Sequence, residues 1–113
     1  MKFRTTQHGS VTVIALQGSL MGGLDAAELN NKVTAAIEAG RKLLVADLGA
    51  VDLMNSSGLG ILIKCASTAR NSGGRLVIAS ASRKVLELFK ITRLTSVFET
   101  HDSVEDAVAA LKR

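Results

Sequence analysis

The sequence predicts an α/β fold, in which a mixed and mostly parallel sheet of four to five strands packs against about four helices. Apolar segments of strand length alternate along the chain with amphipathic segments of helix length, which is typical of parallel sheets with right-handed crossovers. One early strand is apolar on both faces, as expected for a strand that is covered on two sides. The 113 residues, of which 47% are hydrophobic, suit one domain with a single core over residues 1–113.

The first part of the chain predicts two strands and a helix. Lys2–Gln7 and Val11–Gln17 are the strands, and apolar residues fill nearly every position of the second. A glycine-rich loop is expected over residues 18–23, where the chain must turn. Leu24–Ala39 has apolar residues at helical spacing, and Gly40 is a natural residue to end this helix.

The middle of the chain predicts two successive units, each of which is a strand followed by a helix. Leu43–Leu48 is a short apolar strand, and a helix is expected to begin at the Asn55–Ser56 turn and to end near Asn71. Arg75–Ser80 is a second short apolar strand, and Ser82–Ile91 has the apolar spacing of a helix.

The last part predicts a short strand and a closing helix. Val97–Glu99 is the candidate strand. Asp102 and Ser103 then provide a helix cap with acids after it, which predicts a helix over Val104–Leu111. No internal repeat, linker or low-complexity segment interrupts this order.

The composition argues against several kinds of partner and site. The net charge is +4, but the cations are scattered, and the chain has no Trp or Tyr and three Phe with which to stack bases, so we expect no nucleic-acid partner. Cys65 is the only cysteine, and neither His8 nor His101 has a metal ligand at suitable spacing, so we expect no disulfide, metal or cofactor. The apolar runs are too short for membrane insertion and no secretory signal is present, which favours a cytoplasmic protein.

The most informative motif is Asn55-Ser56-Ser57-Gly58, which follows an apolar strand and opens a helix. Unpaired backbone N–H groups and the helix dipole favour negative charge there. A phosphate on such a serine would change the charge that a partner meets by roughly two units. Capping of the helix by Ser56 or Ser57, without regulation, is the simpler interpretation of the spacing alone. Gly58 and Gly60 favour the close approach of another backbone or a partner, because a helical glycine costs up to about 1 kcal/mol relative to alanine.

The helix after this motif offers a candidate contact residue but no catalytic set. Ile61 is expected to face solvent one turn beyond the serines, and Cys65 to be a small packed residue. Neither serine has a histidine nearby in sequence to act as a base. Asp47 and Asp52 suit turn and capping roles better than a catalytic pair. The glycine loop lacks the fingerprints of nucleotide-binding loops, so we expect a protein that is not an enzyme.

The chain resembles the STAS domain family, in particular the stand-alone bacterial anti-sigma-factor antagonists. The resemblance covers nearly all of the chain and rests on LLVADLGAVDLMNSSGLGIL, NSGGRLVIAS, ITRLTSVFE and HDSVEDAVAAL. The family has an apolar strand ending in Asp-Leu, an Asp-Ser-Ser-Gly-Leu-Gly turn at a helix start and a Gly-Gly-x-Leu strand. A short Leu-rich helix and a final helix after an Asp-Ser pair complete the pattern. Order and spacing match throughout, which identifies a STAS domain over residues 1–113.

The resemblance implies a switch in protein binding. Family members bind a cytoplasmic anti-sigma factor that is also a serine kinase, and so release a sigma factor. The kinase inactivates the antagonist by phosphorylating the first serine of the turn, and a serine phosphatase restores it; the matching position here is Ser56. The partner-binding residues that the resemblance implies are Asn55, Ser56, Ser57, Gly58 and Ile61, with Ser19, Met21 and Gly22 in the preceding loop.

Two positions depart from the family pattern. Asn55 stands where the family usually has Asp, which keeps the cap but removes a carboxylate. This change would slow phosphorylation of Ser56, stabilise the phosphorylated form, or mark a member that is not phosphorylated. Arg93 stands where many relatives have glycine, which indicates a local loop difference. The alternative function is a non-phosphorylated STAS scaffold subunit of a lipid-transport or other membrane-associated complex; binding of a small ligand or nucleotide has no phosphate loop to support it.

Overall fold

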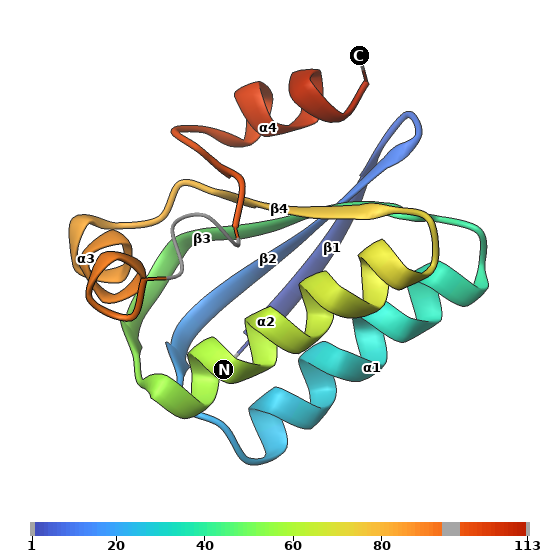
Figure 1. Cartoon of the computed structure of the whole chain (residues 1–113). Coiled ribbons are helices and arrows are strands. Elements are labelled where there is room, and N and C mark those ends of the chain that lie inside the picture. The colour runs from blue at the N-terminus through green and yellow to red at the C-terminus, as the bar shows by residue number, and fades with distance from the viewer. Residues whose placement is uncertain (1, 94–97, 113) are drawn as a thin grey trace.

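The computed structural model describes residues 2–93 and 98–112, and within them a five-stranded sheet packs against four helices (Figure 1), which confirms the predicted fold class. The strands follow one another across the sheet in chain order. The first two strands pair antiparallel, and every later pair is parallel. The strands are β1 (Lys2–His8), β2 (Val11–Leu20), β3 (Leu43–Met54), β4 (Arg75–Ala79) and β5 (Thr100–His101).

The helices form a layer on each face of the sheet (Figure 1). Two helices lie side by side on one face, α1 (Leu24–Glu38) and α2 (Ser56–Asn71), and α4 (Val104–Leu111) covers the other face. The remaining helix, α3 (Arg83–Ile91), lies at the end of the sheet where β3 leads into α2. All four helices begin and end within one residue of their predicted bounds, which is the usual uncertainty of a helix end.

The central strands are apolar on both faces because each face has its own core. In β3, Val45 packs with Ala107 and Leu111 of α4. Its neighbours Leu44 and Ala46 belong to the larger core beneath α1 and α2. Successive side chains of a strand point to opposite faces, so a sheet with helices on both sides needs apolar residues at nearly every position.

Strands β2 and β3 are both longer than predicted. The loop expected over residues 18–23 begins only after Leu20, and β3 continues past Leu48 to Met54. The two extensions pair with each other up to the contact of Leu20 with Met54. Each extension is stabilised by hydrogen bonds to the other strand. Because this partner is distant in the chain, neither segment alone shows a residue pattern that predicts the extension.

The last strand is displaced from its predicted position at Val97–Glu99. Val97 lies outside the described residues, and β5 pairs with the end of β4 at Thr100–His101. Phe98 is buried and stacks on Phe89 of α3, with ring centroids 5.0 Å apart. The apolar residue that suggested a strand therefore fills the core beneath α3.

The turn after α3 explains one departure from the family pattern. Arg93 has a φ of 60°, in the left-handed region that favours glycine. Gly40, which follows α1, has a φ of 84° in the same region and confirms the predicted end of that helix. The arginine therefore takes up a backbone conformation for which glycine would be the unstrained choice.

Candidate functional site

The serine motif lies where β3 ends and α2 begins (Figure 1). Asn55 has an extended backbone (φ −106°, ψ −178°) and caps α2, because its Oδ1 accepts a hydrogen bond from the Gly58 N–H at 2.9 Å. Ser56 and Ser57 are both exposed, and in the described part of the chain neither hydroxyl has a hydrogen-bond partner. Capping by Ser56 or Ser57 was the simpler expectation, and it is wrong: the asparagine caps the helix, and neither hydroxyl is used for capping.

The side chain of Asn55 also holds the loop before α1. Its Nδ2 donates a hydrogen bond to the Met21 carbonyl at 3.2 Å, and its backbone N–H donates to the Leu20 carbonyl at 3.4 Å. An aspartate could accept the bond from Gly58 but could not donate one to Met21, because a carboxylate is only an acceptor. The asparagine therefore links the cap of α2 to the end of β2.

Two glycines allow these segments to approach closely. A Cβ on Gly58 would lie 2.0 Å from the Leu20 carbonyl oxygen, which no side chain could tolerate. Gly22 has a φ of 99°, and a Cβ there would lie 3.0 Å from the Cβ of Ser57. The predicted approach of another backbone is thus confirmed at Gly58, whereas a Cβ on Gly60 would meet nothing within 4 Å.

The expected binding residues differ in their accessibility. Met21 is 47% exposed, and Gly22 and Ser19 are half-buried, Ser19 within β2 rather than in a loop. Ile61 was expected to face solvent, but it is half-buried and packs against the larger core. The reason is that α2 packs along α1 as well as on the sheet, which covers more of its circumference. Cys65 is fully buried as expected, and burial raises the pKa of its thiol to about 11.

Three large apolar side chains are exposed around the serine motif, and sequence reasoning identified only one of them. Met21 was expected there, whereas Leu53, 52% exposed, is the last residue but one of β3, and Leu24, 90% exposed, begins α1. Sequence reasoning placed Leu53 in the turn after a shorter strand and left Leu24 off the apolar stripe of its helix, and it assigned neither residue a role. Met21, whose carbonyl bonds to Asn55, and Leu53, two residues before Asn55, place exposed apolar side chains next to the two exposed serines.

The two aspartates near this end do not form a pair. Both lie within β3, five residues apart along the strand. Asp47 accepts a hydrogen bond from the Gly49 N–H at 3.0 Å, which is the turn-type role expected of it, and Asp52 is exposed. Among the described residues no group of three His, Cys, Asp or Glu could hold a metal ion, and no helix is long and apolar enough to cross a membrane.

Comparison with known proteins gives one family. The model of the STAS domain matches residues 2–107. BtrV of Bordetella bronchiseptica, whose name assigns it provisionally to the anti-sigma factor antagonists, is 30% identical over 112 residues, which cover 99% of this chain and 96% of BtrV.

Two solved structures show the same fold at low identity. A protein of Thermotoga maritima, tm1081, also provisionally named an anti-sigma factor antagonist, superposes with a TM-score of 0.89 at 20% identity, over 98% of this chain and 95% of that one. The cell fate determinant SpoIIAA from Bacillus, solved in its phosphorylated form, superposes with a TM-score of 0.73 at 20% identity, over 96% and 98% of the two chains.

Proposed function

The chain belongs to the STAS domain family, and we propose that residues 1–113 form one domain that acts as an anti-sigma-factor antagonist. Phosphorylation at Ser56 would switch this antagonist off. The observation that carries this proposal is the state of the serine. Asn55 caps α2, so the Ser56 hydroxyl is exposed and has no partner among the described residues. The name of BtrV and the phosphorylated form of SpoIIAA agree with such a role.

A phosphate on Ser56 would act as a local charge switch. The first turn of α2 contains no acidic residue, and its first N–H groups have no carbonyl partner within the helix, so the helix start can accept negative charge. The surrounding surface is apolar, with Met21 and Leu53 exposed. A partner that buries these side chains would also have to bury about two negative charges, which strongly opposes binding.

The proposed partners follow from this switch. An anti-sigma factor with serine kinase activity would bind the unmodified protein and phosphorylate it, and a serine phosphatase would restore it. The protein itself would be the phosphoacceptor in the cytoplasm and would perform no catalysis. The contacts that we propose are made by Asn55, Ser56, Ser57, Gly58, Ile61, Ser19, Met21 and Gly22.

The first test is the intact mass of the protein isolated from its native cells under a phosphatase block, with mapping of the modified residue. We expect a single phosphate at Ser56 whose occupancy changes with growth condition. Absence of phosphate under every condition would contradict the switch.

Variants then test the effect on binding. Ser56→Ala should keep the fold and bind the partner constitutively, and Ser56→Asp should abolish binding measured by affinity purification. Ser10→Asp is the matched control, since it places the same charge on an exposed serine in the turn before β2, at the opposite end of that strand, and should leave binding unchanged. Equal binding by Ser56→Ala and Ser56→Asp would sink the proposed role of this serine.

A further inference from the structure

The loop that joins β2 to α1, residues 21–23 (the Met21 loop), is fastened to the start of α2. The Met21 carbonyl accepts a hydrogen bond from Nδ2 of Asn55 at 3.2 Å. The next residue, Gly22, lies against Ser57, since a Cβ on Gly22 would lie 3.0 Å from the Cβ of Ser57. The position of the loop is therefore tied to the two residues that flank the proposed phosphoacceptor.

The chemistry of its two partners fixes the orientation of the Asn55 amide. The Gly58 N–H can only donate and the Met21 carbonyl can only accept, so Oδ1 faces the first at 2.9 Å and Nδ2 faces the second at 3.2 Å. Aspartate would keep the cap but would put a second acceptor beside the Met21 carbonyl. Serine would also keep the cap, without charge and without an amide N–H for Met21. Asparagine thus fastens the loop as well as the helix.

The Met21 loop has a backbone that could move without this bond. Gly22 and Gly23 have φ values of 99° and 66°, which glycine adopts without strain. Gly23 is also the N-cap residue of α1, and no side chain caps the helix there. Met21 itself is 47% exposed, so a flexible apolar side chain stands on a backbone that Asn55 holds. A side chain held in this way binds a partner at a smaller cost in ordering the loop.

We propose that Asn55 is a positioning residue for the partner that binds at Ser56. Its Nδ2 holds the Met21 carbonyl, so the Met21 side chain stands beside the serine in one arrangement. Met21 makes the apolar contact, and Asn55 raises the affinity through Met21. This inference rests on the proposed function and adds to it that the partner has an apolar pocket for Met21 next to its site for Ser56.

Backbone ¹⁵N relaxation of the full chain tests the positioning without a partner. In the natural chain the order parameters of Met21 and Gly22 should be close to about 0.85, and they should fall towards about 0.6 in both Asn55→Ser and Asn55→Asp. Gly40, in the turn after α1, is the internal reference and should not change. Rigid loops in both variants would overturn the positioning role.

A double-mutant cycle then tests the effect on binding. The probe is the protein that Ser56→Ala retains and Ser56→Asp loses in affinity purification, used in purified form. Asn55→Ser should weaken its binding about fivefold in the natural background and less than about twofold in the Met21→Ala background, because the side chain through which Asn55 acts is then absent. Equal weakening in the two backgrounds would show that Asn55 does not act through Met21.

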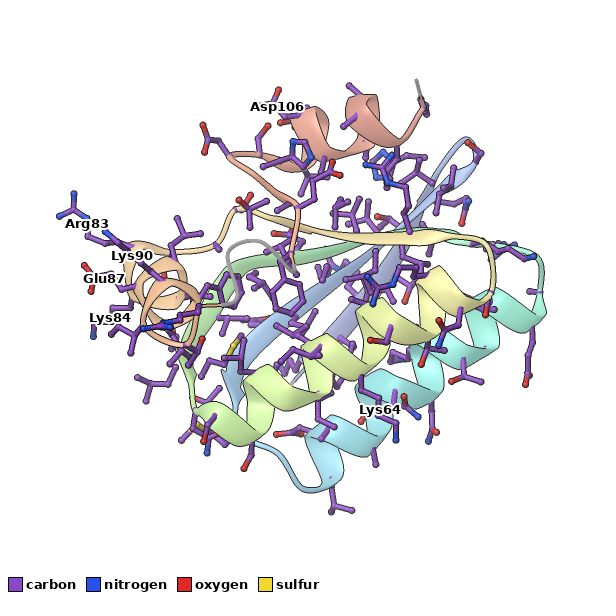
Figure 2. The ribbon with its side chains drawn as sticks, in the orientation of Figure 1. Lys64, Arg83, Lys84, Glu87, Lys90 and Asp106 are labelled. Carbon is purple, nitrogen blue, oxygen red and sulfur yellow. The ribbon has the colours of Figure 1, made fainter. Side chains whose placement is uncertain are left out.

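Two further variants separate positioning from charge and from stability. Weaker binding by Asn55→Asp with natural affinity for Asn55→Ser would assign the effect to the added carboxylate and overturn the proposal. Ser103→Ala is the control for stability, because it removes the cap that accepts the Asp106 N–H at 3.1 Å on α4. This helix lies across the sheet from α2 (Figure 2). Ser103→Ala should lower stability and leave both the affinity and the order parameters of the Met21 loop unchanged.

The outcomes distinguish this inference from the function on which it rests. A rigid loop, or equal weakening in the two backgrounds, rejects the positioning role and leaves the switch at Ser56 standing. If no protein is retained by Ser56→Ala and lost by Ser56→Asp, the proposed function is rejected, and the positioning role with it.

Discussion

At the scale of single residues, Asn55 and Ser56 divide two roles at the start of α2: the asparagine caps the helix, and the serine offers an exposed hydroxyl. The amide of Asn55 caps α2 and holds the Met21 carbonyl, so the Ser56 hydroxyl is not needed for the cap. Sequence reasoning placed Asn55 and both serines at the helix start but could not decide which of them caps it. Asn and Ser both cap well, and the choice depends on the position of Met21, which is distant in sequence.

The glycines of α2 give the first prediction. Gly58→Ala should lower the free energy of unfolding by about 2 kcal/mol or more, because its Cβ would lie 2.0 Å from the Leu20 carbonyl oxygen. Gly60→Ala, where a Cβ would meet nothing within 4 Å, should raise it by up to about 1 kcal/mol. Urea unfolding measures both. If both variants changed the free energy of unfolding in the same direction, α2 and the end of β2 would not be in close contact at Gly58.

At the scale of elements, β5 is short and is tied to β4 by charged side chains. Glu99, just before β5, forms an ion pair with Arg75 at the start of β4 and accepts a hydrogen bond from His101 at 2.7 Å. The bond from His101, followed by the contacts with Arg75, lowers the pKa of Glu99 below its usual 4.5, against the opposing effect of burial. Because Glu99 is 40% exposed, solvent weakens the contribution of these pairs to stability.

The pH dependence of stability tests this contact. A carboxyl whose pKa is lowered by folding stabilises the protein above its unfolded pKa, and the gain disappears as pH falls through the folded value. Glu99→Gln should therefore cost up to about 1 kcal/mol at pH 7, and the difference from the natural chain should shrink as the pH falls below 4.5 and vanish once the carboxyl is protonated in the folded protein. Urea unfolding across this range measures it. Glu28→Gln, an exposed change on α1, is the control; an equal cost there would assign the effect to net charge.

At the scale of the whole molecule, parallel strands bring distant segments to one end of the sheet. Residues 19–22, 52–58 and 84–91 lie far apart in the chain, yet all adjoin the ends of β2, β3 and β4. The carboxyl ends of parallel strands point the same way, which is why binding sites of such sheets gather at that edge. The rest of the molecule holds this edge in place through a core on each face.

The thiol of Cys65 reports how firmly this core is closed. It is fully buried, and burial raises its pKa to about 11, so both access and thiolate formation require opening of the structure. Alkylation of the native protein at pH 8 should be slower than that of the unfolded chain by about a thousandfold or more, as for other domains of ordinary stability. Lys64→Cys with Cys65→Ala places a thiol at an exposed neighbour and should react rapidly. Rapid labelling of Cys65 itself would show that α2 separates readily from the sheet.

The sequence alone determined the order of the elements, the bounds of the helices and the place of the serine motif, because caps, terminal glycines and apolar spacing act within a few residues. The lengths of β2 and β3, the partial burial of Ile61 and the hollow between the end of β3 and α3 arise from tertiary contacts. Each of these depends on strand pairing or on side chains contributed by distant segments. The residues of one segment do not indicate which distant segment will contact it, since such segments come together only when the sheet forms.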